Sequence, residues 1–585
     1  MGGQMIARDG TKLPEGPFVS RIELRLVLGI VLVAAAMSYW LWSGLTQRSI
    51  DGDEGISILA GRGVLEHGWP ELPSGLLYRK GIVSSYLLGG AFALFGVNDF
   101  SNLLPALLFA SGSLVLVMLL ARDLSGSSYL GVVAGAWLVL IETQSRYATS
   151  PRMYAALQFF ALLALYGAWH GWSGKKRGIV IALLALGGAV LSHAQSAALF
   201  VAIPFACFAA GSRPRLLRST QGLIVLGFVI WGMLWLWTGL SQQISSPRIA
   251  DAGGSDPRNF DPAIDLGRVF AQLWALESTA PLSIAFAPLV VLVVARAWRR
   301  RDEPGSRGLR FAFAWLSVCA LLTLFAIGPV DSRFWMMTLP VYLLLLCVAL
   351  VRWIGVLIHS SRRSMTLQAM GFGAWVVALV ASVSWVYGPE RYPEMIAGAY
   401  RVPGSGVMDR NALSVKLAHQ KLADTLLPAD RIVSTNPWVT HYYLGRVDAF
   451  LRERREEVSP VVKRQQNRSL QRVDKQRSIG RPGDEPNDRP SQDREDAPQA
   501  WRFGSFGNAV DEYLGIQLVD TADELTELKE ASERVWIVTD SKFQNYSSPE
   551  TLRRVAGEFI LFHSDASVQI YTKRSFPGAA AEHTR

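Results

Sequence analysis

The chain has 585 residues, half of them hydrophobic, and a formal net charge of +10 at pH 7. Much of the positive charge flanks apolar segments, where Lys and Arg report membrane orientation, so we expect no nucleic-acid partner. The apolar residues are concentrated between Leu26 and Tyr387 in blocks of roughly 17–20, which match the thickness of a hydrocarbon core. This excludes an ordinary soluble protein of amphipathic helices and alternating strands.

The first apolar block is Leu26–Leu45. It is too long for a signal-peptide core, so we expect an uncleaved first span preceded by a cytoplasmic N-terminus, residues 1–25. About eleven spans are predicted. They are Leu26–Leu45, Leu103–Ala121, Tyr129–Ile141, Met153–Trp169, Ile179–Leu191, Ala197–Ala210, Leu223–Leu240, Leu282–Ala297, Phe311–Ile327, Phe334–Val351 and Met370–Val386.

Basic residues gather in alternate loops, as the positive-inside rule requires. The predicted cytoplasmic clusters are Lys175–Arg177, Arg213–Arg218, Arg299–Arg310 and Arg352–Arg363. An apolar stretch at Ile82–Val97 would invert every later loop if it crossed the membrane, so we expect it to be an interfacial or re-entrant helix. The pattern predicts a multi-pass protein of a bacterial inner membrane, with residues 26–387 as the transmembrane domain.

Residues 388–585 are predicted to form an extracytoplasmic α/β domain, because short apolar strands alternate with amphipathic helices. The expected helices are Asn411–Leu427, Asp523–Arg534 and Ser548–Ala556, and the expected strands Arg431–Thr435, Val535–Thr539, Phe559–Phe562 and Val568–Tyr571. Residues 452–500 are rich in charge and proline and poor in aromatics. This composition predicts a disordered insert.

Several polar groups fall on the predicted outer face. The first outer loop contains Asp51, Asp53 and Glu54, whose carboxylates suit a general base with a partner, or a solvated loop. It continues with Tyr78-Arg79-Lys80. Paired cations next to an interfacial helix suit a phosphate or, alternatively, lipid headgroups.

The next outer segment, Glu142 to Tyr154, holds Arg146 and Arg152 against the usual charge bias. An unpaired charge at the edge of a span is costly, so Arg152 is a candidate for phosphate binding, whereas Arg146 can pair with Glu142. Two further candidates lie between spans on the same face. His193 suits a metal, a sugar or an interhelical hydrogen bond, and Arg333 suits a phosphate or a pair with Asp331.

No nucleotide- or dinucleotide-binding motif occurs in a fitting context, and the three cysteines, all in apolar spans, form no disulfide or zinc pattern. No cofactor is required by the sequence. A divalent metal cation near Asp53, Glu54 and His193 is left open.

Taken together, these motifs resemble the GT-C class of integral-membrane glycosyltransferases, most closely glycosyltransferase family 39, which includes protein O-mannosyltransferases and bacterial lipid A aminoarabinose transferases. The resemblance implies that Asp53 is the catalytic base, that Glu54 assists it, and that Lys80 contacts the carrier phosphate. Gly81 replaces the proline that usually follows. The run from Arg146 to Tyr154 is similar to the family's Tyr-Ala-x-x-x-Arg-x-Tyr pattern, which implies that Arg152 binds the carrier.

Two later motifs extend the resemblance. Arg333 to Pro340 resembles the late Arg-Tyr-x-x-x-x-x-Pro motif, with Phe334 in place of Tyr. Asn436 to Gly445 resembles a Tyr-Tyr-Leu-Gly element of the outer domain in related bacterial transferases.

The resemblance implies an inverting transfer of a sugar from a polyprenyl-phosphate carrier to an envelope glycan, lipid or protein, with membrane lipid as a further partner. Three alternatives stay open. A lipid-linked sugar flippase or transporter would show internal repeats and charges near the bilayer centre. A polysaccharide polymerase or ligase would lack the early acidic pair, and a non-catalytic scaffold would leave that pair and the arginines unexplained.

Overall fold

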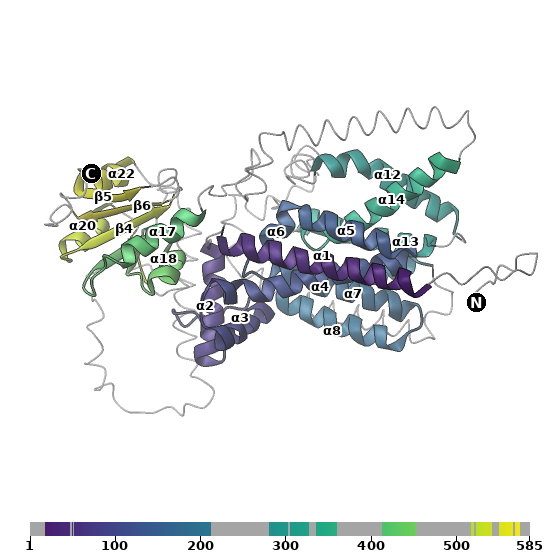
Figure 1. The fold of residues 1–585 in the computed structure, drawn as a ribbon. Coiled ribbons are helices and arrows are strands. Elements are labelled where there is room, and N and C mark those ends of the chain that lie inside the picture. Colours follow the sequence, from purple (N-terminus) through teal and green to yellow (C-terminus); the bar gives the residue numbers. More distant parts are fainter. Residues whose placement is uncertain are drawn as a thin grey trace, which may run out of the picture.

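The computed structural model describes residues 18–46, 50, 52–211, 280–301, 305–326, 335–359, 412–451, 516–519, 522–540, 549–564 and 568–573. A bundle of helices occupies one end of the molecule and a mixed sheet the other (Figure 1). The N-terminal helices are α1 (Phe18–Thr46), α2 (Gly52–His67), α3 (Ile82–Phe95), α4 (Asp99–Ser125), α5 (Ser128–Leu140), α6 (Glu142–Ala148), α7 (Tyr154–Trp172), α8 (Lys176–Ser192) and α9 (Ala197–Ala209). Helices α12 (Ala280–Arg299), α13 (Ser306–Ala326) and α14 (Leu339–His359) complete the bundle.

Nine of the eleven expected spans fall on helices: α1, α4, α5, α7, α8, α9, α12, α13 and α14. The other two, 223–240 and 370–386, lie outside the described residues. Within the described chain, two helices are long and apolar enough to cross a membrane by length and composition, Val27–Leu45 within α1 and Asp99–Ser125. The count of eleven spans and their orientation therefore remain predictions.

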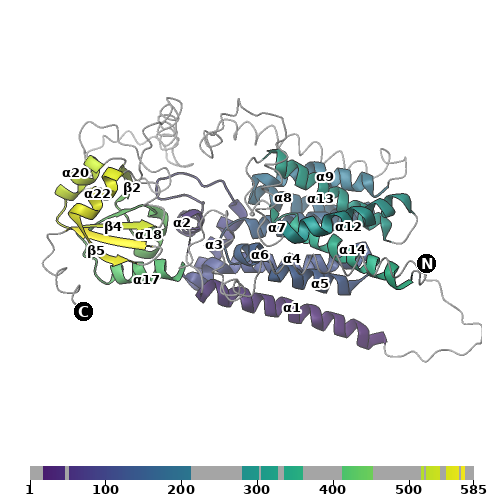
Figure 2. The ribbon, with the colours of Figure 1, turned by 90° about the horizontal axis from the view of Figure 1, so that it is seen from above.

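The bundle is held together by close helix contacts and one large apolar core. In Figure 2, α1 runs along one edge of this bundle. Helices α7 and α8 approach closely because Gly167 and Gly178 face each other: a Cβ on Gly167 would lie 2.5 Å from the backbone nitrogen of Ala182. Small residues at helix crossings allow such backbone contact, which favours packing in a bundle of apolar helices.

Helices α2 and α3 lie between the bundle and the sheet in both views (Figures 1 and 2). Gly61 of α2 meets α3 closely, since a Cβ there would lie 2.7 Å from Leu88 Cβ. The opposite side of α3 exposes Tyr86, Leu87 and Leu94. An exposed apolar side suits contact with lipid, and the interfacial or re-entrant position of Ile82–Val97 stays a prediction.

The sheet has the order β3-β2-β1-β4-β6-β5. Its strands are β1 (Arg431–Ser434), β2 (Ala449–Leu451), β3 (Gln517–Val519), β4 (Val535–Asp540), β5 (Phe559–Ser564) and β6 (Val568–Lys573). The first four are mutually parallel, and β6 is antiparallel to both β4 and β5. The surrounding helices are α17 (Ala412–Ala423), α18 (Pro437–Leu444), α20 (Ala522–Glu530) and α22 (Pro549–Glu558).

Strand alternation directs side chains to two cores, one on each face of this sheet. Ile432 and Trp536 pack with α17 and with residues of α2, whereas Val433 and Val535 pack with α20 and α22. The expected strands and helices after residue 411 are present. Strands β2 and β3 and helix α18 were not expected, and the predicted insert 452–500 lies outside the described residues.

Candidate active site

The acidic run marks the start of a helix. Asp53 and Glu54 occupy the first turn of α2, although the sequence suggested a loop, and that expectation is wrong for these two residues. Carboxylates are favoured there because the first turn of a helix carries free N–H groups and a partial positive charge. Asp51 lies outside the described residues.

The two carboxylates have different surroundings. The side chain of Asp53 is half exposed, and its Oδ2 lies 2.6 Å from Nη1 of Arg152. Glu54 is 1% exposed and accepts a hydrogen bond from the Ser150 hydroxyl. One acid is therefore accessible to a substrate, and the other is fixed within the protein.

Arg152 joins the acidic turn to a cluster of rings. Its side chain is largely buried, and its guanidinium carbon lies 5.1 Å from the centre of the Tyr154 ring. Tyr154 packs against Tyr147 and His193, with ring centres 5.1 and 5.4 Å away. The structure thus brings Asp53, Arg152, Tyr154 and His193 together, as expected from their common face.

Tyr78 is buried next to this cluster. Burial raises the pKa of its hydroxyl above the ordinary value of 10.0, while the positive charge of Arg152 acts in the opposite direction. The phenol therefore stays neutral at physiological pH and remains a hydrogen-bond donor. The neighbouring side chains of Arg79 and Lys80 are exposed, so both charges lie at the protein surface next to the cluster.

Gly81 connects this cationic segment to α3. It has φ 69° and ψ 44°, in the left-handed region, at the N-cap of α3. A Cβ at this position would lie 2.9 Å from Met153 Cβ. Proline, whose φ is fixed near −65°, cannot adopt this conformation, whereas glycine adopts it without strain.

Two predicted site residues are less closely tied to the cluster. Arg146 lies with its guanidinium carbon 5.6 Å from the ring centre of Tyr147. Arg333 lies outside the described residues, but its motif continues to Met336, which is buried in one cluster with Tyr147 and Tyr154.

Sequence reasoning missed two supports of this site. Ser150 donates a hydrogen bond to Glu54, which lies 96 positions earlier in the sequence, so no local sequence pattern indicates this contact. Gln144 and Gln158 are fully buried and exchange two hydrogen bonds of 3.1 and 2.8 Å, and Gln158 also donates to the Met336 carbonyl at 2.8 Å. Gln158 within the apolar helix α7 was a usable signal, because buried polar groups need partners.

The sequence left a metal near Asp53, Glu54 and His193 open. Among the described residues, no group of three or more His, Cys, Asp or Glu side chains is placed to hold a metal ion. His193 is also engaged, since its Nδ1 accepts a hydrogen bond of 3.0 Å from the backbone N–H of Gln195.

Comparisons with known proteins identify the fold of the chain. No family model matches the sequence, and no curated protein matches it. The chain is similar to ArnT from Cupriavidus metallidurans bound to undecaprenyl phosphate, with a TM-score of 0.53, 15% identity, and coverage of 93% of this chain and 97% of that one. The apo state of the same ArnT gives 0.52, 16%, 93% and 97%.

The chain has the ArnT fold. The fold that the sequence resemblance implied is thereby confirmed. An oligosaccharyltransferase from Archaeoglobus fulgidus, in complex with Zn and sulfate, gives a lower TM-score of 0.46 at 11% identity, covering 93% of this chain and 72% of that one. In the ArnT fold of this chain, the acidic turn, Arg152 and the tyrosine cluster lie where the bundle meets the sheet-bearing part.

Proposed function

We propose that this protein is an inverting glycosyltransferase that moves a sugar from a polyprenyl-phosphate carrier to an envelope acceptor on the outer face of a bacterial inner membrane. The observation that carries the proposal is the pairing of an accessible carboxylate, Asp53, with a largely buried arginine, Arg152, at 2.6 Å. An acid beside a cation suits a reaction that must remove one proton and stabilise one departing phosphate. The shared fold with an undecaprenyl-phosphate-bound ArnT supports the same donor class.

In the proposed reaction, Asp53 accepts the proton of the acceptor hydroxyl or amine. The oxygen or nitrogen then attacks the anomeric carbon from the side opposite the phosphate, and the bond between that carbon and the phosphate oxygen breaks. The phosphate leaves with the bonding electron pair. Arg152, Lys80 and Arg79 supply positive charge for it, and Arg333 belongs to the same proposed set.

Glu54 and His193 have different proposed roles. Glu54 is held by Ser150 and buried, so it fixes the acidic turn and assists Asp53 through local charge. His193 packs on Tyr154, and this contact supports a role for His193 in binding the sugar.

The test is a product assay. Purified protein is incubated with radiolabelled polyprenyl-phosphate sugars and an envelope extract, next to Asp53→Asn and the control Asp424→Asn, which alters an exposed acid at the end of α17. Loss of a general base lowers the rate by about 10²–10⁴-fold, so Asp53→Asn should lose transfer while Asp424→Asn retains it.

Two results would redirect the proposal. Full transfer by Asp53→Asn would remove the catalytic assignment. Failure of well-folded native protein to consume any donor would favour the flippase or scaffold alternatives, and a lipid-flipping assay in vesicles would then separate those two.

A further inference from the structure

Helix α18 is rigidly fixed to the sheet. The hydroxyl of Thr440 contacts the Ser434 hydroxyl at 2.7 Å and Nε2 of His419 at 3.1 Å, which ties α18 to β1 and α17. His419 is almost fully buried, and its ring lies 5.2 Å from that of Tyr443. A movement of the sheet must therefore carry α18 with it.

The same helix meets α2 directly next to the acidic pair, at Gly55. A Cβ on Gly55 would lie 3.1 Å from both the carbonyl carbon and the Cβ of Trp438, and 3.2 Å from its carbonyl oxygen. These distances are tighter than ordinary van der Waals contact, and two of the three atoms belong to the backbone. A side chain at position 55 would require the two helices to move apart by a few tenths of an ångström.

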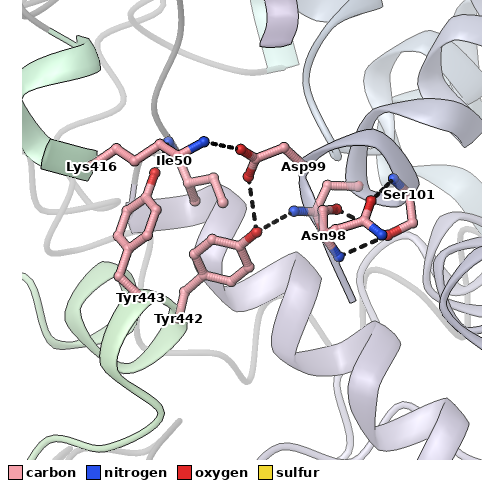
Figure 3. Close-up of polar contacts among 8 residues, drawn as sticks. Ile50, Asn98, Asp99, Ser101, Lys416, Tyr442 and Tyr443 are labelled. Carbon is pink, nitrogen blue, oxygen red and sulfur yellow. Dashed lines mark hydrogen bonds and ion pairs between the residues drawn. The ribbon is translucent and has the colours of Figure 1, made fainter. Parts of the chain in front are cut away.

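Polar contacts join α17 and α18 to Ile50, before α2, and to the start of α4 (Figure 3). The Tyr443 hydroxyl accepts a hydrogen bond of 3.4 Å from the backbone N–H of Ile50, just before the acidic run. The Tyr442 hydroxyl donates to Asp99 at 3.1 Å and accepts from Asn102 at 2.7 Å, and Lys416 of α17 pairs with the other oxygen of Asp99. Residues of α17 and α18 thus hold the start of α2 and the start of α4 together.

The apolar contacts extend the same connection. Ile56, Leu59 and Tyr78 lie in one buried cluster with Ile432 and Trp536 of the sheet. The side of α2 that carries Ile56 and Leu59 is therefore packed by the α/β part, whereas Ile58 packs against Leu88 and Phe92 of α3.

We propose that α18 is a positioning element of the active site: through Gly55 and Tyr443 it holds the first turn of α2, and with it Asp53 and Glu54, so that turnover depends on this contact. The inference rests on the proposed transferase function. Neither Gly55 nor Tyr443 touches the reacting atoms in this scheme. Both act through the placement of the carboxylates.

The experiment uses full-length protein with graded substitutions. Gly55→Ala adds a methyl group next to Trp438, and Gly55→Val adds a larger, branched side chain there. Tyr443→Phe removes only the hydroxyl that accepts the hydrogen bond from Ile50. The matched controls are Gly557→Ala and Gly557→Val in α22, where a Cβ would meet nothing within 4 Å. Measured quantities are kcat and donor KM, binding of undecaprenyl phosphate as a probe, and hydrogen exchange of the amides in the first two turns of α2.

We expect kcat to fall about 3–10-fold in Gly55→Ala and further in Gly55→Val, because the contact must open by a few tenths of an ångström and about 1 Å of misplacement can cost 10²-fold. Donor KM and binding of undecaprenyl phosphate should change less than about twofold, since a positioning role affects the reacting geometry more than carrier binding. Exchange at the start of α2 should accelerate in the Gly55 and Tyr443 variants and stay unchanged in the Gly557 controls.

Wild-type turnover in both Gly55→Ala and Tyr443→Phe, or unchanged exchange in α2, would overturn the inference. If Gly55→Val does not fold, Tyr443→Phe still decides the question. The exchange measurement needs no transfer, so it also separates the two proposals. If the native protein showed no transferase activity but the Gly55 and Tyr443 variants still exchanged faster in α2, the α18 contact would be supported and the proposed function would be wrong.

Discussion

Asp53 and Glu54 are adjacent in the sequence, yet their side chains have opposite surroundings. Exposure and an arginine partner suit Asp53 to chemistry, and burial against Ser150 suits Glu54 to support. The order of the motifs and their common face were enough to predict that Asp53, Arg152 and His193 would meet. Ser150 could not be predicted, because its role depends on a long-range contact and a serine carries no distinctive pattern.

The contact between Ser150 and Glu54 predicts a stability effect. Ser150→Ala removes a hydroxyl donor from a buried carboxylate, and leaving such a group with one bond fewer costs about 1–3 kcal/mol of the free energy of unfolding. The check is the melting temperature in detergent. Ser173→Ala is the control, since Ser173 is exposed at the end of α7 and bonds only locally to the Trp169 carbonyl. Equal melting temperatures for the two variants would contradict the supporting role of Ser150.

At the scale of helices and strands, the apolar blocks predicted most of the bundle because length and hydropathy determine a spanning helix. Helices α2, α6 and α18 were missed because each is short or mixed in character and is fixed by its neighbours. Strands β2 and β3 contain three residues each and leave no periodic signal. Their positions follow from pairing with β1 and with each other.

The start of α3 provides a prediction at this scale. Gly81→Ala places a side chain in the left-handed region and close to Met153, which should cost about 1–2 kcal/mol and shift Tyr78 and Lys80. We expect weaker binding of undecaprenyl phosphate and a lower melting temperature. Gly90→Ala in the same helix is the control, because a Cβ there would meet nothing within 4 Å. Equivalent behaviour of the two variants would show that the backbone at Gly81 is not constrained.

The packing of α17 against α18 predicts a pH dependence. Burial lowers the pKa of His419 from 6.5 to about 4. The unfolded chain therefore takes up the proton first on acidification, and stability is lost as the pH falls from about 6.5 to about 4, by roughly 3 kcal/mol in total. Above pH 6.5 both states are neutral at this position, and the effect vanishes.

The corresponding experiment compares melting temperatures across pH 4–7. His419→Gln should flatten the profile, whereas His67→Gln, at an exposed position, should leave it unchanged. A His419→Gln profile as steep as that of the native protein would assign the acid sensitivity to other groups.

At the scale of the whole molecule, sequence composition predicted a membrane part, residues 26–387, followed by an α/β part. It did not predict how closely these parts are joined, because hydropathy describes segments and says nothing about shared cores. The shared cluster contains Tyr78 as well as residues of α2 and the sheet. The candidate site thus depends on both parts of the chain.

The parallel pairing of β2 and β3 makes the predicted insert testable. Residues 452–515 connect strands whose Cα partners include Leu451 and Val519, and a parallel connection needs about a dozen residues. Deleting residues 452–500 leaves 501–515 for the crossover, so we expect unchanged membrane expression and melting temperature. Deleting 452–515 should prevent the pairing and lower both. Loss of expression in the shorter deletion would show that the segment contributes to folding.

The cluster shared by α2 and the sheet also affects how the protein is made. Its members extend from Ile56, near the beginning of the chain, to Ile570, near the end. At about 5–20 residues per second, roughly half a minute to two minutes of synthesis separate the emergence of these two residues. During that interval Ile56 and Leu59 of α2 lack the sheet residues against which they pack. A ribosome that stops early, or a chain shortened before β6, would therefore leave the helix that carries Asp53 and Glu54 unsupported, and the proposed activity would begin only once translation is nearly complete.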